Sequence, residues 1–335
     1  MLAGCGEGDE DARTLTVATF NLHLAGGKPG AAAAEIAAGS PQLDAIAAVI
    51  ASVDPDVLVL NEVDFDAEAT ALEALRARLA ADGLAWAHAY AAPVNTGLRT
   101  GLDIDGDGST AGPSDAHGWG VFEGQFGLAV LSRLPIEADE ARSFRLLRWA
   151  DVPGAARPDR APERLRLSSK SHWIVPLRLG EARVGLLMAH PTPPIGNAAM
   201  RPVNIARNAA EIDLLRAMID GAPWLRNDAG EAVAPLKGPL IVAGDLNADP
   251  ARGDGDRTGI ARLLAHPRLT DPLPGQPTAW WPKGPGALRV DYLLPSTEWQ
   301  VLEAGVVWPE PGEALASEAE AASDHRMVWA RLRLK

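Results

Sequence analysis

Polar side chains stand at the ends of several apolar segments, from the first segment of the sequence to its last. They are Asn21, Glu62, His190, Asp245, Asn247, Asp291, Asp324 and His325. Burying such a group without a partner costs roughly 2–7 kcal/mol. Because the same pattern recurs along the chain, we expect these side chains to converge on one site. Carboxylates, amides and imidazoles can together bind a cation and stabilise a charged phosphoryl group.

Two of these residues follow a single apolar run, in Gly244-Asp245-Leu246-Asn247. Asp245 and Asn247 are two positions apart, so in an extended chain both side chains point to one face. The carboxylate can take a proton while the amide donates a hydrogen bond. We therefore expect this pair at the reacting group.

The last polar group, Ser323-Asp324-His325, precedes the final apolar run. Neighbouring residues of a regular strand face opposite sides, so joint use of Asp324 and His325 requires a bend. His325 is the best candidate donor to a phosphoryl oxygen and needs a carboxylate to fix its tautomer and charge. Asp291 is a candidate for that partner. Glu62 is the best candidate ligand for Mg²⁺, which prefers one or two carboxylates with waters and phosphate oxygens.

The apolar pattern locates the elements that must position these side chains. Runs rich in aliphatic and β-branched residues predict strands over residues 14–22, 56–60, 126–132, 172–179, 183–190, 239–244, 289–294, 300–307 and 326–333. The pattern predicts helices over residues 43–53, 67–81 and 204–220, and loops over residues 91–124, 248–258, 271–287 and 308–323. Strands and helices do not alternate strictly, which favours mixed, largely antiparallel sheets over a doubly wound parallel sheet.

The composition is that of a globular protein and disfavours intrinsic disorder, with 47% hydrophobic and 22% charged residues among 335. The 31 Lys and Arg against 44 Asp and Glu give a net charge of −13. This excludes the broad basic surface of a sequence-independent nucleic-acid binder, so a nucleic-acid substrate would need a local basic strip or bound cations. No run of about 18 apolar residues occurs, so we expect no membrane-spanning segment.

Five short motifs resemble, in order, those of the endonuclease/exonuclease/phosphatase superfamily. They are Thr19-Phe20-Asn21, Leu60-Asn61-Glu62, Gly244-Asp245-Leu246-Asn247, Val290-Asp291-Tyr292 and Ser323-Asp324-His325. The resemblance covers about residues 14–333. It implies the α+β class, as a four-layer α/β/β/α sandwich with two mixed, largely antiparallel sheets. It also implies divalent-metal-dependent hydrolysis of phosphoester bonds by in-line attack of water, as a phosphodiesterase, nuclease or phosphatase.

The resemblance further implies roles for the catalytic residues. Asp245 would orient or deprotonate the attacking water, and Asn247 would hold a phosphoryl oxygen. Asp291 would pair with His325, and His190 would touch the phosphate. Metal and imidazolium would then stabilise the charge of the transition state.

The resemblance also implies a bound Mg²⁺ or Mn²⁺. Glu62 would be its principal ligand, with Asn21 and Asp324 beside it. The chain departs from the family in two respects. Some members pair a Glu with the His at position 190, and Glu123 is one candidate here; the segment 91–124 also exceeds a minimal member. Because of these departures, the resemblance does not identify the substrate of this chain. A nucleic acid and a small organic phosphate both stay open. A non-catalytic binding module that retains the fold is the alternative function.

Two features of the sequence have both a functional and a plain structural interpretation. Asp103, Asp105 and Asp107 match the start of a calcium loop, although the twelfth position is Ser114 rather than Glu. A structural Ca²⁺ is one interpretation, and a turn insertion without a cation is the simpler one. Trp280-Trp281 is either an aromatic rim of the site or loop packing.

The single cysteine, Cys5, rules out an internal disulfide. Leu2-Ala3-Gly4-Cys5 resembles a bacterial lipoprotein cleavage box, although a signal's basic and apolar regions do not precede it. We interpret residues 1–13 as a tether that is either lipidated or merely frayed, and residues 14–335 as one domain with an insertion at 91–124. If the lipoprotein-like box is genuine, we expect a bacterial protein outside the cytoplasm, either secreted or lipid-anchored. Otherwise we expect it in the cytoplasm. We expect a monomer.

Overall fold

A computed structural model describes residues 13–335, whose strands form two large sheets packed face to face. The six-stranded sheet has the order β12-β13-β1-β2-β4-β3 and comprises β1 (Thr14–Asn21), β2 (Val57–Asn61), β3 (His88–Tyr90), β4 (Leu128–Ser132), β12 (Trp299–Val306) and β13 (Val328–Leu334). The five-stranded sheet has the order β11-β8-β7-β6-β5 and comprises β5 (Arg142–Ser143), β6 (His172–Leu179), β7 (Ala182–Ala189), β8 (Leu240–Asp245) and β11 (Asp291–Pro295).

Each sheet contains one parallel pair of strands, β1 with β2 and β7 with β8. The other neighbours in both sheets are antiparallel. The prediction of two mixed, largely antiparallel sheets is therefore confirmed. In β2, Val57 and Val59 face the other sheet while Leu58 and Leu60 face the helices, so both faces are buried and the strand reads as a continuous apolar run.

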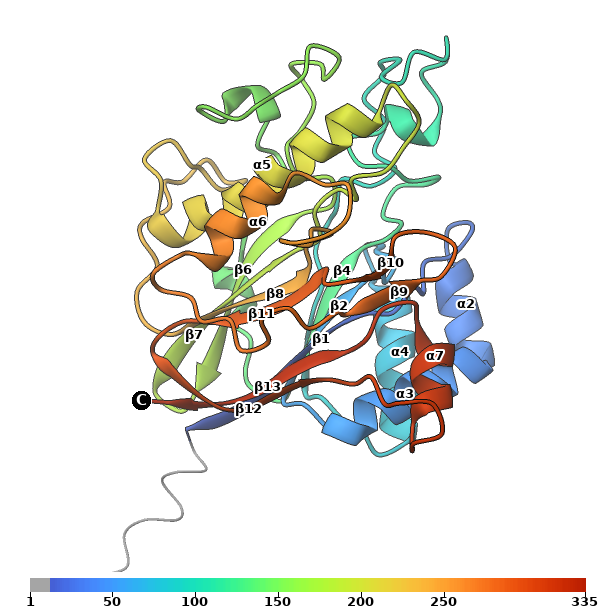
Figure 1. The fold of residues 1–335 in the computed structure, drawn as a ribbon, viewed down its shortest axis with the longest axis vertical. Coiled ribbons are helices and arrows are strands. Elements are labelled where there is room, and N and C mark those ends of the chain that lie inside the picture. Colours follow the sequence, from blue (N-terminus) through green and yellow to red (C-terminus); the bar gives the residue numbers. More distant parts are fainter. Residues whose placement is uncertain (1–12) are drawn as a thin grey trace, which may run out of the picture.

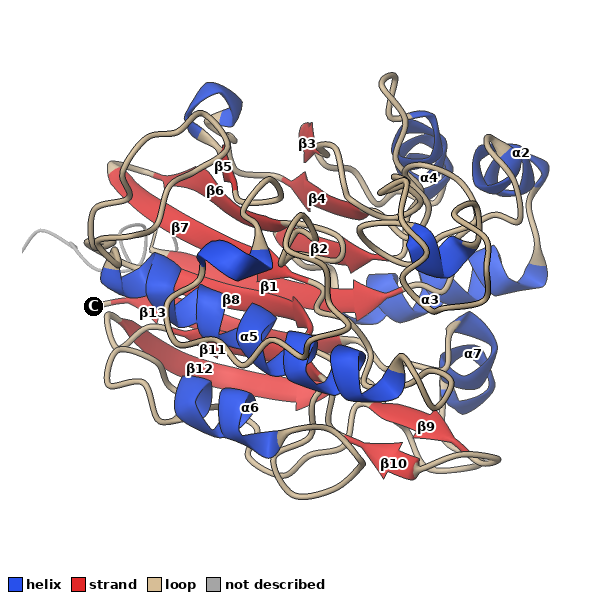
Figure 2. Ribbon diagram, turned by 90° about the horizontal axis from the view of Figure 1, so that it is seen from above, coloured by secondary structure: helices blue, strands red, loops and turns tan. Residues whose placement is uncertain are grey.

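Helices cover the outer face of each sheet and complete four layers (Figures 1 and 2). The six-stranded sheet packs against α2 (Ala31–Ala38), α3 (Pro41–Val53), α4 (Thr70–Ala81) and α7 (Ala316–Ala322). The five-stranded sheet packs against α5 (Arg201–Asp220) and α6 (Arg257–Leu264). Figure 1 shows the two helix groups on opposite sides of the strands. The predicted four-layer sandwich is thus the observed fold.

Several short elements lie where the sequence predicts loops. The predicted loop 271–287 contains a hairpin of β9 (Ala279–Trp281) and β10 (Gly286–Leu288), and the predicted loop 308–323 contains α7. Helices α2 and α6 were also not predicted. These elements have three to eight residues each, too few to show a clear apolar period, and they form through tertiary packing. In contrast, residues 91–124 contain no α-helix or extended strand, as predicted.

No single helix in residues 13–335 is long and apolar enough to cross a membrane. Helices α2 and α3 would be long and apolar enough only if taken together, and a 78° bend separates them. Both helices contribute buried residues to the core against the six-stranded sheet.

Candidate active site

The two parallel strand pairs, one from each sheet, end at a common edge of the sandwich. Strands β1 and β2 finish in register at Asn21 and Asn61. In the other sheet, β8 finishes at Asp245, which lies opposite Asp291 at the start of the antiparallel strand β11. Two hydrogen bonds join the sheets here: Asn21 Nδ2 donates to Asp245 Oδ2 (3.0 Å), and the Asp245 amide donates to Asn61 Oδ1 (3.3 Å). We call Asn21, Asn61, His190, Asp245, Asp291 and His325 the strand-end cluster.

Asp245 is the buried centre of the strand-end cluster. Its Oδ2 lies 3.3 Å from His190 Nε2 and 3.8 Å from His325 Nε2, and its Oδ1 accepts a hydrogen bond from the Asn247 amide (2.9 Å). Burial would raise the pKa of this carboxyl, but the two histidines and the Asn247 hydrogen bond lower it below its usual value. Asp245 is therefore held as a carboxylate.

The turn after Asp245 differs from the extended chain expected from the sequence. Asn247 has φ 51°, in the left-handed region, so the chain turns back and its backbone amide meets Asp245. Gly244 precedes this turn with φ 143°, and a Cβ at that position would lie 2.2 Å from the Ala189 carbonyl oxygen. Glycine therefore allows β8 to approach the end of β7, where His190 follows.

His325 is paired with Asp291, at 2.9 Å between Nδ1 and Oδ2. Burial disfavours the charged imidazole, but the charges of Asp291 and Asp245 raise the pKa of His325 to about 10. Burial also raises the pKa of Asp291, so the pair competes for one proton. We place this proton on His325, because Thr278 Oγ1 donates a hydrogen bond to the same Asp291 oxygen (2.8 Å) and favours the carboxylate.

The chain bends at Asp324, as the use of both Asp324 and His325 requires. Asp324 Oδ2 accepts a hydrogen bond from Trp281 Nε1 (2.7 Å), and Asp324 Oδ1 lies 3.3 Å from His23 Nδ1. Burial would raise the pKa of Asp324, but these donors and the charge of His325 lower it to about 2. Trp281 also packs edge-on against His325, with ring centroids 5.3 Å apart, whereas its neighbour Trp280 is exposed.

Glu62 follows β2 with φ 63° and faces a cavity beside the strand-end cluster. Its Oε1 accepts a hydrogen bond from Asn21 Nδ2 (3.2 Å), and no other described residue donates a hydrogen bond to the carboxylate. Oxygen ligands of this kind suit a hard divalent cation such as Mg²⁺ or Mn²⁺. Atoms of Asp245, Asp291 and His325 also lie within 4.8 Å of one another, but there a charged imidazole would repel a cation. Glu62 is therefore the better-placed ligand.

His190 does not lie beside the Glu123 considered as its partner. Glu123 is exposed, whereas His190 is buried against Asp245. Burial and the charge of Lys170 lower the pKa of His190, so its imidazole is neutral. Its Nδ1 has no hydrogen-bond partner within the described part of the chain.

Two charged residues near the site were not predicted from the sequence. Lys170 is 7% exposed and lines the same cavity as Glu62. Burial lowers the pKa of Lys170, while Glu62, Glu211 and Asp245 oppose this shift. Glu211 is buried in α5 and accepts hydrogen bonds from the amides of Ser169 and Thr192, both at 2.6 Å. The sequence could have indicated Lys170 as a site residue, because it stands just before the apolar strand β6.

The predicted calcium loop forms a compact turn on the segment 91–124. Carboxylate oxygens of Asp103, Asp105 and the buried Asp115 lie within 4.8 Å of one another, while Asp107 is outside this group. Asp103 Oδ1 accepts a hydrogen bond from the Gly106 amide (2.7 Å). A bound Ca²⁺ stays a prediction, as does lipidation of Cys5, which lies outside the described residues.

The fold and the order of these residues place the chain in a known family. It belongs to the endonuclease/exonuclease/phosphatase family, whose sequence profile matches residues 18–325. No curated protein sequence matches it significantly.

Solved structures with the same fold have low sequence identity to this chain. An endonuclease/exonuclease/phosphatase from Beutenbergia cavernae DSM 12333 is 22% identical with a TM-score of 0.61, over 96% of this chain and 72% of that one. The human Nocturnin catalytic domain with bound sulfate anion is 17% identical with a TM-score of 0.55, over 96% and 95%. Sphingomyelinase C from Streptomyces griseocarneus is 20% identical with a TM-score of 0.51, over 95% and 99%.

Proposed function

We propose that the protein hydrolyses phosphoester bonds by in-line attack of water with the help of Mg²⁺ or Mn²⁺. The observation that carries this proposal is the contact between a carboxylate and a charged imidazole, Asp245 and His325, at the edge where both sheets end. A buried cationic donor can stabilise the negative charge that develops on a phosphoryl group.

The metal would be held mainly by Glu62, with Asn21 and Asp324 beside it. When bound, it would neutralise phosphate oxygens and polarise the attacking water. In the described structure the Asn21 amide nitrogen faces Glu62 and Asp245, and Asp324 is occupied by Trp281 and His23. These contacts favour Asn21 and Asp324 as groups that orient the ligand Glu62 and the surrounding charges.

The lowered pKa of Asp245 supports one of its two candidate roles. A carboxylate stabilised by several donors is a weak base, so we assign Asp245 to orienting the attacking water. His325 Nδ1 is engaged by Asp291, which leaves Nε2–H to donate to a phosphoryl oxygen. The water oxygen forms a bond to phosphorus as the bond to the ester oxygen breaks. One water proton is lost to solvent, and the departing alkoxide takes up another from solvent.

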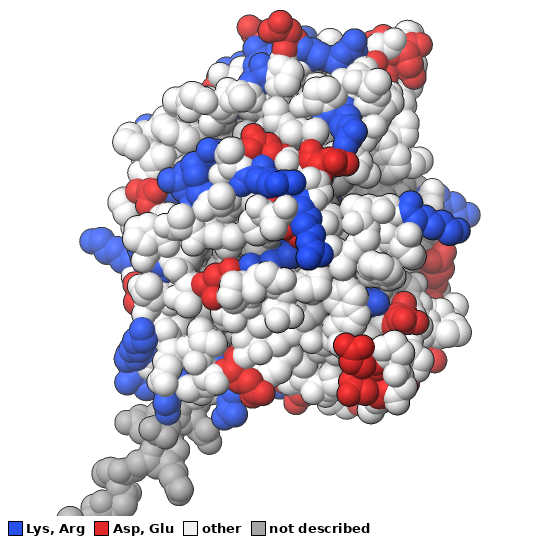
Figure 3. All heavy atoms as spheres, viewed as in Figure 1, with Lys and Arg blue, Asp and Glu red and all other residues white. Residues whose placement is uncertain are grey.

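Small organic phosphates fit this site better than long nucleic acids. Acidic and basic side chains are mixed on the face shown in Figure 3, and the chain has a net charge of −13. A nucleic acid is bound mainly through phosphate contacts from a basic surface. Near Glu62, the buried amine of Lys170 would contact the phosphate.

A panel of phosphoesters tests the proposal. Bis(4-nitrophenyl) phosphate and 4-nitrophenyl phosphate are incubated with the protein and Mg²⁺, Mn²⁺ or Ca²⁺, each with and without EDTA. We expect release of 4-nitrophenol with Mg²⁺ or Mn²⁺ and its loss with EDTA. If the folded protein hydrolyses no phosphoester with any of these metals, the proposal fails and the non-catalytic binding module replaces it.

Metal binding is measured separately from turnover. Titration calorimetry with Mn²⁺ compares Glu62→Gln with the matched control Glu303→Gln, which changes an exposed glutamate on β12. We expect roughly 100-fold weaker Mn²⁺ binding for Glu62→Gln, in the range seen when a metal site loses a supporting group. Unchanged affinity would remove Glu62 from the metal site.

A further inference from the structure

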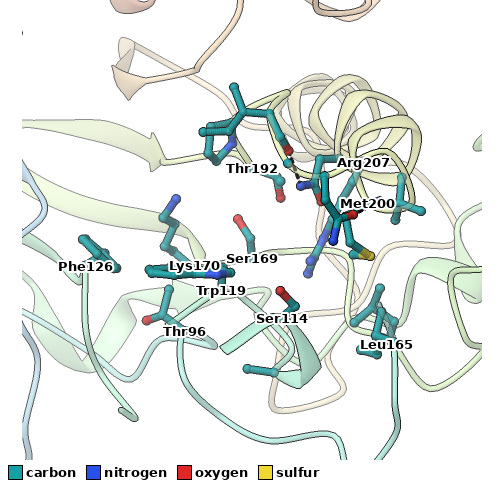
Figure 4. A pocket seen from close by; sticks show the side chains of 18 of the residues that line it. Thr96, Ser114, Trp119, Phe126, Leu165, Ser169, Lys170, Thr192, Met200 and Arg207 are labelled. Carbon is teal, nitrogen blue, oxygen red and sulfur yellow. Dashed lines mark hydrogen bonds between the residues drawn. The ribbon is translucent and has the colours of Figure 1, made fainter. Parts of the chain in front are cut away.

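A cavity of about 410 Å³ opens beside Glu62 and Lys170, and we call it the side cavity. Its volume lies within the range of sites that hold small molecules. Besides Glu62, four stretches of chain line it: parts of residues 96–126, parts of 165–170, the segment 192–200 and the first turns of α5. Figure 4 shows Lys170 and Phe126 at one side of this space and Leu165 and Met200 at the other.

Three buried hydroxyl groups on the wall of the side cavity lack hydrogen-bond partners. They are Thr96 Oγ1, Ser169 Oγ and Thr192 Oγ1, and none of them bonds to another described residue. The Lys170 ammonium likewise has no hydrogen bond to any side chain in residues 13–335. In Figure 4 the Ser169 and Thr192 oxygens and the Lys170 nitrogen lie around one space. Buried polar groups are normally paired, so these hydroxyls leave hydrogen-bonding capacity on this wall that polar atoms of a ligand could take up.

Beyond these hydroxyls the side cavity is lined by aliphatic side chains. Ile104, Leu165 and Val203 are buried there, and Met200 is packed against the same core. At its rim, Trp119 and Ile195 are 55% and 66% exposed. Each methylene transferred from water to such a surface improves affinity by about fourfold. The far end of the side cavity therefore favours hydrocarbon.

The cationic side chain at this far end, Arg207, donates most of its hydrogen bonds to backbone carbonyls. Arg207 donates hydrogen bonds to the carbonyls of Leu167 (2.8 Å), His117 (2.5 Å) and Arg166 (2.7 Å). The Asn204 side-chain nitrogen Nδ2 donates to the Ile195 carbonyl (2.6 Å). Arg207 therefore fixes the wall through Nε and Nη2, which leaves only Nη1 without a hydrogen bond among the described residues.

We propose that the side cavity binds the organic group of the substrate, and that this group is an amphiphile with an oxygen function next to the phosphate and an aliphatic chain beyond it. This inference rests on the proposed function, because it places the phosphate at Glu62 and Lys170. Dissolved short-chain phosphoesters and phospholipids in a bilayer share this chemistry.

Binding of n-alkyl phosphates tests the aliphatic part without requiring turnover. Titration calorimetry in the presence of Mn²⁺ compares methyl, butyl and hexyl phosphate. We expect the Kd to fall by about fourfold per methylene, or on the order of 10³-fold from methyl to hexyl. Equal Kd values for methyl and hexyl phosphate would overturn the proposal. Tighter binding of thymidine 5′-phosphate than of hexyl phosphate would overturn it as well, and would assign the side cavity to a nucleoside.

Filling the side cavity supplies the structural test. In Val203→Phe the added ring occupies the space, and we expect the ratio of the methyl to the hexyl Kd to fall to about tenfold or less. Leu302→Phe adds a ring at an exposed position of β12 and serves as the matched control, with the ratio unchanged. Melting temperatures confirm that both variants are folded. An unchanged ratio in folded Val203→Phe would place the alkyl chain outside the side cavity.

The hydroxyl groups are tested with 2-hydroxyhexyl phosphate. We expect it to bind up to about tenfold more tightly than hexyl phosphate, because one hydrogen bond is gained. Thr192→Val and Ser169→Ala remove hydroxyls with little change of shape, and at least one should abolish this preference. A preference retained in both, and in Thr96→Val, would overturn the assignment of these hydroxyls.

The source of the amphiphile is resolved by hydrolysis. Turnover of dissolved dihexanoyl phosphatidylcholine is compared with turnover of dioleoyl phosphatidylcholine vesicles. Faster turnover of vesicles supports a membrane source, and faster turnover of the dissolved lipid supports a soluble one. If the alkyl series binds as expected but no ester is hydrolysed, the cavity assignment stands and the proposed function fails.

Discussion

The strand-end cluster and the side cavity bury different kinds of polar group: an array of charged side chains in the first and neutral hydroxyls in the second. In the strand-end cluster, Asp245 meets donors from both sheets at 2.9–3.3 Å. In the side cavity, three hydroxyls have no partner among the described residues. Asn61 Nδ2, His190 Nδ1 and Asp291 Oδ1 of the strand-end cluster also lack partners among the described residues, but Asp245 and His325 are held in their charged forms before any organic group binds. The side cavity leaves hydroxyl groups for a ligand, so under the proposed function the two neighbouring regions would divide chemistry from selectivity.

Two histidines show the same contrast in electrostatic terms. His325 faces the carboxylates Asp291 and Asp245, which raise its pKa to about 10. His117, beside the side cavity, is surrounded by arginines; burial and then the charges of Arg166 and Arg207 lower its pKa to about 4. At neutral pH the first is charged and available to an anion, while the second is neutral and structural.

The largest expected effect comes from removing the charge at the centre of the strand-end cluster. Asp245→Asn keeps the size of the side chain but loses the carboxylate that we propose orients water, and it loses the charge beside His325. We expect kcat/KM for bis(4-nitrophenyl) phosphate to fall by about 10³-fold or more. Asp139→Asn, at an exposed position, is the matched control and should retain full activity. A loss of less than tenfold in a folded Asp245→Asn variant would contradict this role.

Two glycine substitutions test the strand-end cluster and the side cavity separately, because each glycine packs closely against one of these regions. A Cβ at position 244 would meet the Ala189 carbonyl oxygen at 2.2 Å, and one at position 118 would meet the Ser169 carbonyl oxygen at 1.7 Å. We expect Gly244→Ala and Gly118→Ala each to lower the free energy of unfolding by about 1–3 kcal/mol, measured by urea denaturation. Gly244→Ala should impair hydrolysis of every phosphoester, whereas Gly118→Ala should mainly weaken hexyl phosphate binding. The reverse pattern would refute the division into two regions.

A smaller effect is expected from the tryptophan that supports Asp324. Trp281→Phe retains the aromatic contact with His325 but removes the hydrogen bond to Asp324. We expect Mn²⁺ affinity to weaken by about tenfold, as for other groups that orient metal ligands. Trp280→Phe changes the exposed neighbour and is the matched control. Calorimetry that finds equal affinity for both variants would count against a role of Asp324 near the metal.

The smallest predicted effect is a pH dependence of stability from the side-cavity wall. Because the folded-state pKa of His117 is lowered to about 4 from 6.5, the unfolded chain binds a proton in this window that the folded chain does not. The stabilising contribution is complete above pH 6.5 and is lost as the pH falls toward 4. His117→Gln should make the urea midpoint less dependent on pH between 6.5 and 4. An identical pH profile in this variant would show that His117 does not contribute.

The strand-end cluster could be anticipated from the sequence because its residues violate the apolar pattern around them. Asn21, His190, Asp245, Asp291 and His325 each border a strand that is otherwise apolar. Asp291 and His325 are 34 positions apart. Their contact depends on the register of β8 with β11 and on the bend at Asp324, which the structure shows. The left-handed turn at Asn247 was not anticipated, because Asn permits that conformation without requiring it.

The side cavity gave no comparable signal. Thr96, Ser169 and Thr192 are ordinary loop residues in sequence, and only tertiary packing buries their hydroxyls around one space. Lys170 stands beside a strand as the other charged residues do, but only tertiary packing buries it at the side cavity. The short helix α7 and the hairpin β9–β10 were not predicted for a related reason, because short elements show little periodicity in sequence.

The most direct test of the account is a double-mutant cycle between Asp245 and His325. It is measured as kcat/KM for bis(4-nitrophenyl) phosphate with Mn²⁺, using Asp245→Asn, His325→Gln and the double variant. Residues that act as one unit lose most of the activity when either is removed. We predict that the double variant is about as slow as the slower single variant. Losses that multiply, or activity retained in both single variants, would contradict a single catalytic unit built from the two sheets.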